Sequence, residues 1–107
     1  MLFEIHSSSD ATLVRCSGRM VQGDGPDGLL RAVMSQDCRN IQVDLSKVSC
    51  IDANGLGALA ALETWARRAK CRVELLNPSE RCREALEKTR LISVLQVRWT
   101  TPNGAAA

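Results

Sequence analysis

The sequence predicts an α/β fold: a single domain with a mixed, mainly parallel sheet, an antiparallel strand at its N-terminal edge, and helices packed on the sheet. Three observations carry this prediction. Segments with the alternating apolar pattern of strands take turns with segments whose apolar residues recur at helical spacing, which gives the order β-β-α-β-α-β-α-β. Only a short polar turn separates the first two strands, as in a hairpin. The chain has 107 residues, enough for one domain.

The first elements are a hairpin, a glycine-rich loop and a helix. Residues 2–6 and 12–16 have the composition of short strands, and the polar residues 7–10 between them favour a turn. Residues 18–28 include four glycines, so we expect a loop here that leads into a helix. The buried stripe of that helix is predicted to be Leu29, Leu30, Val33 and Met34.

The middle of the chain is predicted to form a strand and the clearest helix. Residues 41–45 alternate as a strand, and a second apolar segment, 48–51, runs up to Asp52. A helix then opens at Asn54, which we expect to be its N-cap, and reaches about residue 69. Its buried face is predicted to be Leu56, Leu59, Leu62, Ala66 and Ala69.

The last third of the chain is predicted to add a strand, a helix and a final strand. Residues 72–76 form the strand, Pro78 blocks its extension, and Ser79 is a favoured N-cap for the helix that follows. The buried stripe of this helix is predicted to be Cys82, Ala85, Leu86 and Thr89. Residues 91–97 supply the last strand. We therefore expect one domain over residues 1–100 and a loose C-terminal tail at 101–107.

The composition excludes several classes of function. The net charge of +2 and the 3% of aromatic residues give little support for nucleic-acid binding. The only histidine is His6, so a Ser/His/Asp set cannot be assembled around a central imidazole, and we expect no enzyme and no cofactor. The chain shows no apolar run of the ~20 residues that a membrane span needs. Residues 1–10 lack the pattern of a signal peptide, so we expect a cytoplasmic protein without membrane insertion.

The five cysteines form no CxxC pair. In a cytoplasmic chain this spacing favours reduced, mostly buried thiols over a zinc site or a disulfide framework, so we expect no metal.

The most informative stretch is residues 43–57, where a strand delivers Asp52 to its carboxyl end and a glycine-rich helix start follows. In open α/β sheets, ligands and partners are met at this edge. Gly55 and Gly57 leave backbone N–H groups uncovered and let another surface approach closely. A helix start of this kind can also receive an anion, although GxG alone is too short to indicate a nucleotide site.

With these motifs the chain resembles the STAS domain, which is shared by sulfate transporters and anti-sigma factor antagonists. The resemblance rests on Asp44-Leu45, on Ile51-Asp52-x-x-Gly55-Leu56-Gly57, on residues 73–79 and on residues 86–91, and it covers about residues 2–98. It implies a bacterial protein-binding module in signalling and transcription regulation. In the antagonists, the pattern is Asp-Ser-Ser-Gly-Leu, and an anti-sigma factor that is also a kinase phosphorylates the second serine. A phosphate there adds about −1.5 to −2 charge and prevents binding.

This chain departs from the antagonists at the position of the switch. Asp52 and Gly55 match the pattern, but Ala53 and Asn54 replace the two serines. Neither side chain has a hydroxyl, so the position equivalent to the phosphoacceptor, Asn54, cannot be phosphorylated. Ser46 and Ser49 lie upstream, and phosphorylation there is left open.

The main hypothesis is a regulator similar to an anti-sigma factor antagonist, which binds a kinase-fold anti-sigma factor through the loop 46–49 and the start of the helix. Without an acceptor at Asn54, this binding would be constitutive. A homodimer is left open. The residues expected to contact the partner are Asp52, Ala53, Asn54, Gly55, Leu56, Gly57, Ala58 and Ala61.

Several alternatives remain open at this point. The chain could instead be a STAS accessory subunit of a larger assembly, such as a lipid-transport ATPase complex or a stress-signalling scaffold, or, less favoured, a binder of a small anion. Asp52 is either an anchor for a partner or a strand-end residue bound by backbone donors. Trp65 is either the aromatic end of a docking strip with Gly57, Ala58 and Ala61, or a side chain that folds over the edge of its own domain.

Overall fold

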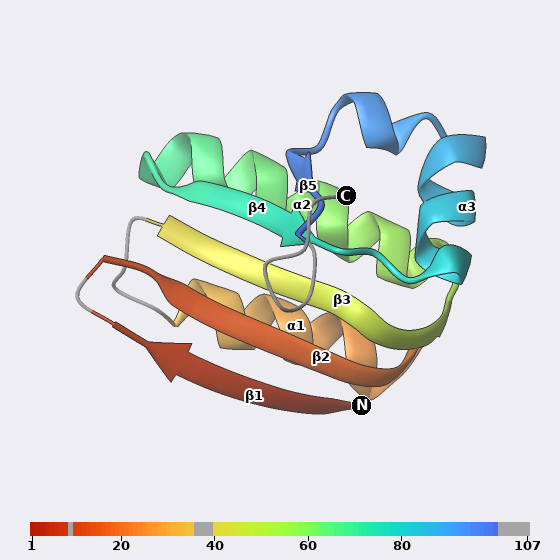
Figure 1. Cartoon of the computed structure of the whole chain (residues 1–107), viewed down its shortest axis with the longest axis horizontal. Helices are drawn as coiled ribbons and strands as arrows, with labels where there is room; N and C mark the ends of the chain where they lie inside the picture. Colours follow the sequence, from red (N-terminus) through yellow and green to blue (C-terminus); the bar gives the residue numbers. More distant parts are fainter. Residues whose placement is uncertain (9, 36–39, 101–107) are drawn as a thin grey trace.

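The computed structural model describes residues 1–8, 10–35 and 40–100, and the strands there form one sheet in the order β1-β2-β3-β4-β5 (Figure 1). β1 runs antiparallel to β2, and the remaining neighbours are parallel, so the predicted mixed sheet is confirmed. The elements are, in chain order, β1 (Leu2–Ser7), β2 (Thr12–Met20), α1 (Asp24–Met34), β3 (Asn40–Ile51), α2 (Ala53–Ala69), β4 (Arg72–Leu76), α3 (Glu80–Lys88), a 3₁₀ turn η1 (Leu91–Ser93) and β5 (Val97–Arg98).

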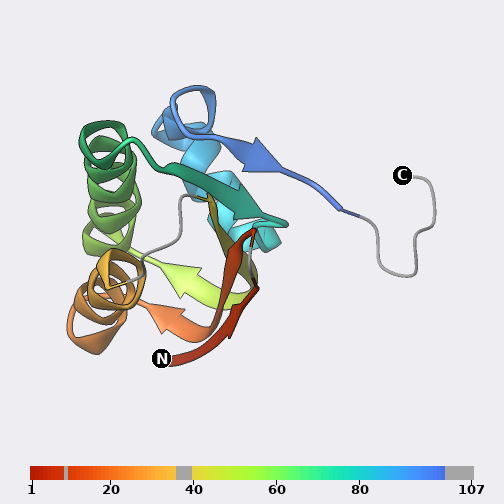
Figure 2. The same cartoon turned by 90° about the vertical axis from the view of Figure 1, so that its left-hand side faces the viewer.

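The helices all begin at one end of the sheet. α1 and α2 lie side by side on one face, and α3 lies beyond the end of the sheet, against the last part of β3 (Figures 1 and 2). No helix of the described residues covers the opposite face, which we call the open face (Figure 2). Because each helix follows a parallel strand, the N-terminal turns of α1, α2 and α3 gather at the carboxyl edge of the sheet.

The core lies mainly between the sheet and the pair α1 and α2. Its largest fully buried side chains include Met20, Leu29, Ile41, Leu45, Leu59, Leu62 and Leu86. The predicted helical stripes are largely confirmed, but three of their end residues are not buried. Met34 is 41% exposed, and Ala69 and Thr89 are exposed as well, because each lies in the last turn or at the cap of its helix, past the edge of the sheet.

Two segments that we expected to be loops belong largely to strands and a helix. β2 continues to Met20 and α1 begins at Asp24, so the predicted loop 18–28 shrinks to a short link. β3 is one strand of 12 residues, and the expected loop 46–49 lies within it. The physical reason is that the β2–β3 register shifts twice, between Arg15 and Ser17 and between Gly18 and Arg19. Such bulges bend β3 without ending its pairing.

The end of the chain also differs from the prediction. Of the expected strand 91–97, the first part is the 3₁₀ turn η1, and β5 pairs with β4 only at Val97 and Arg98. Leu91 and Ile92 pack against the core from this turn, so their apolar pattern reflects burial rather than strand pairing. The expected tail, 101–107, lies outside the described residues. Within the described part, no helix is long and apolar enough to cross a membrane.

Candidate functional site

Asp52 ties the starts of α1 and α2 together at the carboxyl edge of the sheet. Its Oδ1 accepts the Gly55 backbone N–H at 3.0 Å, which caps α2, and its Oδ2 accepts the Gln22 backbone N–H at 2.9 Å. Its own N–H donates to the Met20 carbonyl at 3.2 Å. The link between β2 and α1 is therefore joined to the link between β3 and α2 by one side chain, and both of its carboxylate oxygens are occupied within the chain.

The N-cap of α2 is thus Asp52, and the expectation that Asn54 caps this helix is wrong. α2 begins at Ala53, so Asn54 already lies in the first turn, while the extended backbone of Asp52 places its carboxylate over the free N–H groups. The Asn54 side chain is exposed. It is consequently not required for capping, and it stands at the surface of the helix start.

The charge of Asp52 is stabilised by these donors. The Gln22 N–H, then the Gly55 N–H, lower the pKa of the Asp52 carboxyl group, and the backbone and side-chain amides of Asn54 act in the same direction. Desolvation raises this pKa by less than either the Gln22 or the Gly55 N–H lowers it. The start of α2 therefore carries a fixed negative charge at neutral pH.

Gly55 and Gly57 have different environments. A Cβ on Gly55 would lie 2.4 Å from the Met20 carbonyl oxygen and 2.6 Å from Cγ1 of Ile51. The surface that approaches Gly55 closely is therefore formed by the ends of the chain's own β2 and β3. Gly57 has nothing within 4 Å of the same position, and it is exposed. Of these two glycines, only Gly57 offers bare backbone to another molecule.

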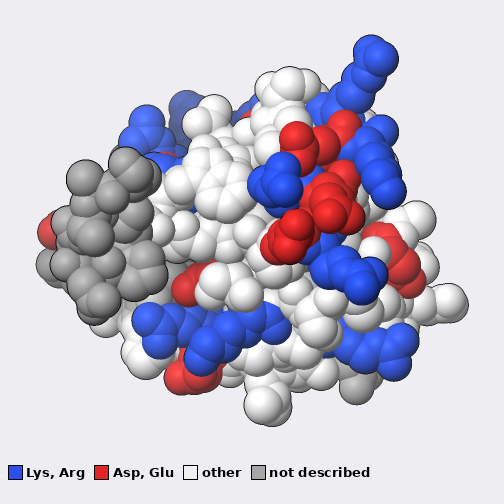
Figure 3. Space-filling model, turned by 45° about the vertical axis from the view of Figure 1, so that its right-hand side comes forward, with Lys and Arg blue, Asp and Glu red and all other residues white. Residues whose placement is uncertain are grey.

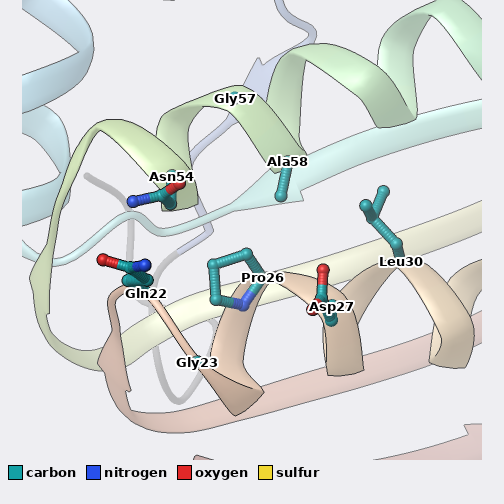
Figure 4. Close-up of a pocket in the computed structure, with 8 residues that line it drawn as sticks. All are labelled: Gln22, Gly23, Pro26, Asp27, Leu30, Asn54, Gly57 and Ala58. Carbon is teal, nitrogen blue, oxygen red and sulfur yellow. The ribbon is translucent and has the colours of Figure 1, made fainter.

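A shallow cavity of about 350 Å³ lies between the first turns of α1 and α2 (Figure 4). The side chains of Asn54 and Gln22 face one another across it, and Pro26 and Leu30 point from α1 towards α2 (Figure 4). The residues that line the cavity are Gln22, Gly23, Pro26, Asp27, Leu30, Asn54, Gly57 and Ala58. We call this surface the α1–α2 groove.

The structure divides the residues that we expected on the partner surface. Ala53, Asn54 and Gly57 are exposed, and Ala61, Leu56 and Asp52 are half-buried. Gly55 and Ala58 are buried, Ala58 with 4% exposure, because both lie on the side of α2 that packs onto its own domain. Ala58 therefore does not lie on the outer face of α2 where we expected it, although it lines the floor of the α1–α2 groove.

Trp65, Cys16 and Cys82 contribute to the core rather than to the groove. Trp65 packs against the hydrophobic core, so the interpretation that it folds over its own domain is the one that the contacts support. Burial raises the pKa of the Cys16 thiol to about 12 and also raises that of Cys82. Cys50 and Cys71 are partly exposed, and Cys38 lies outside the described residues. In the described part of the chain, no group of three or more His, Cys, Asp or Glu side chains could hold a metal ion.

Charges of both signs are intermingled over α3 (Figure 3). On that helix Arg83 and Glu87 form an ion pair one turn apart, at 2.5 Å. This arrangement gives no patch of a single sign there for a nucleic acid or an anionic surface.

Sequence reasoning missed the half of the groove that α1 contributes. Gln22, Pro26 and Asp27 lie in the segment that we took for a loop. The only signal was topological: the carboxyl ends of neighbouring parallel strands lie side by side, so the residues after β2 had to flank those after β3.

Comparisons with known proteins agree with this architecture. The Thermotoga maritima protein TM1081, which has been assigned provisionally as an anti-sigma factor antagonist, superposes with a TM-score of 0.81 and 17% identity over 94% of this chain and 87% of that protein. The anti-sigma factor antagonist SpoIIAA of Bacillus, in its unphosphorylated form, gives a TM-score of 0.76 and 16% identity over 94% of this chain and 90% of that one. An anti-sigma factor antagonist from Mycobacterium paratuberculosis superposes with a TM-score of 0.75 and 18% identity over 95% of this chain and 87% of that protein.

The TM-scores show a common fold, and at these low identities they show the fold alone. A search of curated proteins gave no significant match. The model of the family described as "Mlab, STAS domain" matches residues 7–96, which is most of the chain and includes every residue of the α1–α2 groove. The chain therefore belongs to this STAS domain family.

Proposed function

We propose that the chain is a protein-binding regulator similar to an anti-sigma factor antagonist, and that it binds a kinase-fold anti-sigma partner at the α1–α2 groove. The observation that carries the proposal is the position of Asn54, exposed at the start of α2, beside bare backbone at Gly57 and above a cavity. A partner that docks here meets polar groups at the rim and the apolar side chain of Leu30 from α1.

The missing hydroxyl at Asn54 makes the proposed binding independent of phosphorylation at this position. SpoIIAA, which shares the fold, is known in an unphosphorylated and a phosphorylated form. In this chain the resemblance aligns Asn54 with the phosphorylated serine. The uncharged amide keeps this position in the state that favours binding in the antagonists.

The proposal is tested by the dissociation constant of the kinase-fold anti-sigma factor for Asn54→Asp. The new carboxylate lies one turn or less from the charged Asp52, where a docked partner would have to bury it. Negative charge in the first turn of a helix does not destabilise the helix, so folding is retained. We expect binding to weaken about tenfold or more. Equal affinity of the two proteins would exclude this surface.

Gln96→Glu is the matched control, because it makes the same amide-to-acid change at an exposed position near the C-terminal end of α2. It should bind like the wild type. Asn54→Ser supplies a hydroxyl at the switch position, and a cognate kinase is expected to phosphorylate it. Phosphorylation of the wild type at Ser46 or Ser49 would show a switch of another kind, since both side chains are exposed on β3.

A second candidate is a permanent accessory subunit of a larger assembly. The observation that favours it is the family match itself, because the matching family is named for Mlab and not for the antagonists. In such an assembly binding is permanent, so a residue at position 54 that cannot be phosphorylated does not impair function. Affinity capture of the full chain distinguishes the two candidates: a soluble kinase-like protein supports the regulator, and a membrane ATPase supports the subunit.

A further inference from the structure

We propose that two copies of the chain pair through the outer edge of β1, antiparallel to each other, so that their sheets join into one. This surface is separate from the α1–α2 groove, and the inference does not depend on the proposed function.

β1 is an end strand of the sheet, and among the described residues only its β2 side is paired. Such an edge presents a row of backbone N–H and C=O groups that another strand can bind. It also carries exposed apolar side chains, because Leu2 is 74% and Ile5 is 44% exposed. Pairing with a second strand would satisfy the backbone groups and cover part of this apolar surface.

The pairing with β2 assigns the side chains of β1 to the two faces of the sheet. Ile5 lies opposite the fully buried Val14, and Phe3 reaches Gly28 of α1, so Phe3 and Ile5 are on the face that the helices cover. Glu4 lies opposite Arg15, and His6 lies within 3.7 Å of Glu4. Glu4 and His6 are therefore on the open face.

Symmetry restricts how two β1 strands can pair. A two-fold axis perpendicular to the sheet keeps each face on its own side, so every cross-strand pair must join side chains of the same face. An axis through Glu4 or Ile5 gives the longest overlap of the two strands, and an axis through Phe3 or His6 gives a shorter one. An axis at Glu4 or His6 would place identical polar groups against each other, which is unfavourable for two carboxylates.

The axis at Ile5 is the register that the charges favour. It sets Ile5 against Ile5 of the second copy, and it sets Glu4 of each copy opposite His6 of the other. An imidazole N–H can donate to a carboxylate in either protonation state. The acid and the imidazole thus form two complementary pairs across the axis. In proteins that avoid edge pairing, by contrast, charged side chains on the edge strand repel those of a second copy.

Sedimentation equilibrium of the full chain and of three variants tests this pairing. A six-residue edge makes a small interface, so we expect a weak, reversible dimer of the wild type. Its dissociation constant should lie below about 1 mM. His6→Glu places two carboxylates opposite each other on both sides of the axis and should weaken the dimer roughly tenfold or more. His6→Lys keeps opposite charges facing and should dimerise at least as well as the wild type. Gln96→Glu, next to β5 at the other edge, should behave like the wild type.

Three results would overturn the proposal: a wild type that stays monomeric at 1 mM, a His6→Glu variant that dimerises unchanged, or a Gln96→Glu variant that is weakened as much. Cysteine cross-linking checks the register independently of stability. Ile5→Cys places two thiols across the axis within disulfide range, and mass spectrometry should find the peptide linked to itself after mild oxidation. Self-linked peptides from Glu4→Cys or His6→Cys in place of Ile5→Cys would refute the axis at Ile5.

Discussion

Gly55→Ala and Gly57→Ala place the same methyl group two residues apart on α2, and we expect opposite effects on stability. The added carbon at Gly55 would lie 2.4 Å from the Met20 carbonyl oxygen and 2.8 Å from the Met20 Cγ. Because carbon–oxygen contacts normally begin at about 3.3 Å, the backbone would have to separate by about 0.9 Å. At Gly57 the methyl meets nothing within 4 Å.

The magnitude follows from what must move. Met20 is fully buried, and its carbonyl accepts the Asp52 N–H, so it cannot retreat without loss of packing and of that hydrogen bond. Overpacking costs about 1–3 kcal/mol and the hydrogen bond about 1 kcal/mol, and helix propensity returns at most about 1 kcal/mol. We expect Gly55→Ala to lower the free energy of unfolding by about 1–3 kcal/mol. Gly57→Ala should raise it by about 0.5–1 kcal/mol.

Urea unfolding followed by circular dichroism measures both changes, provided that the slope of free energy against urea is the same in all three proteins. The midpoints should lie on opposite sides of the wild type. If both variants shift to the same side by similar amounts, the close approach of β2 to α2 at Gly55 is not as the structure has it.

Three further predictions concern stability. Ser79→Ala should cost about 1–2 kcal/mol in urea unfolding, because its hydroxyl caps α3 at the Cys82 N–H and donates to the Val48 carbonyl at 2.6 Å. The lowered pKa of Asp52 contributes stability above its ordinary value of 3.8 that is lost as the pH falls through the folded-state pKa, so Asp52→Asn should flatten the acid limb of an unfolding midpoint measured against pH. The raised pKa of Cys16, about 12 against 9.0, contributes stability below pH 9 that is lost as the pH rises towards 12, and Cys16→Ala should remove this part of the alkaline loss. If Asp52→Asn leaves the acid part of the stability–pH curve unchanged, or Cys16→Ala leaves the alkaline part unchanged, that residue does not cause the pH dependence.

Periodicity predicted the order and type of the elements because it reports burial on a face. The stripe through Leu59 and Leu62 and the alternation of Ile41 and Val43 each have one side towards the core. The same reasoning failed where the burial of a residue does not depend on the type of element that contains it. Leu91 and Ile92 are partly buried from a 3₁₀ turn, and the bulge that keeps residues 46–49 in β3 depends on pairing with β2, which a local pattern does not carry.

The site was predictable in place but not in detail. The Asp52-x-x-Gly55 pattern located the helix start, and the alternative in which backbone donors bind Asp52 is the one that the structure favours. The choice between Asp52 and Asn54 as N-cap could not be made from residue type, since both cap well. The contribution of Gln22 and Pro26 required the register of β2 against β3.

The most direct test of the proposed binding surface is an NMR titration of the full chain, labelled with ¹⁵N, with the partner obtained by capture. The account predicts the largest chemical-shift changes at the backbone amides of Gln22, Asn54 and Gly57, which border the α1–α2 groove. It predicts small changes on α3 and along β1. A footprint centred on α3 or on the open face of the sheet, with the Asn54 and Gly57 signals unmoved, would contradict it.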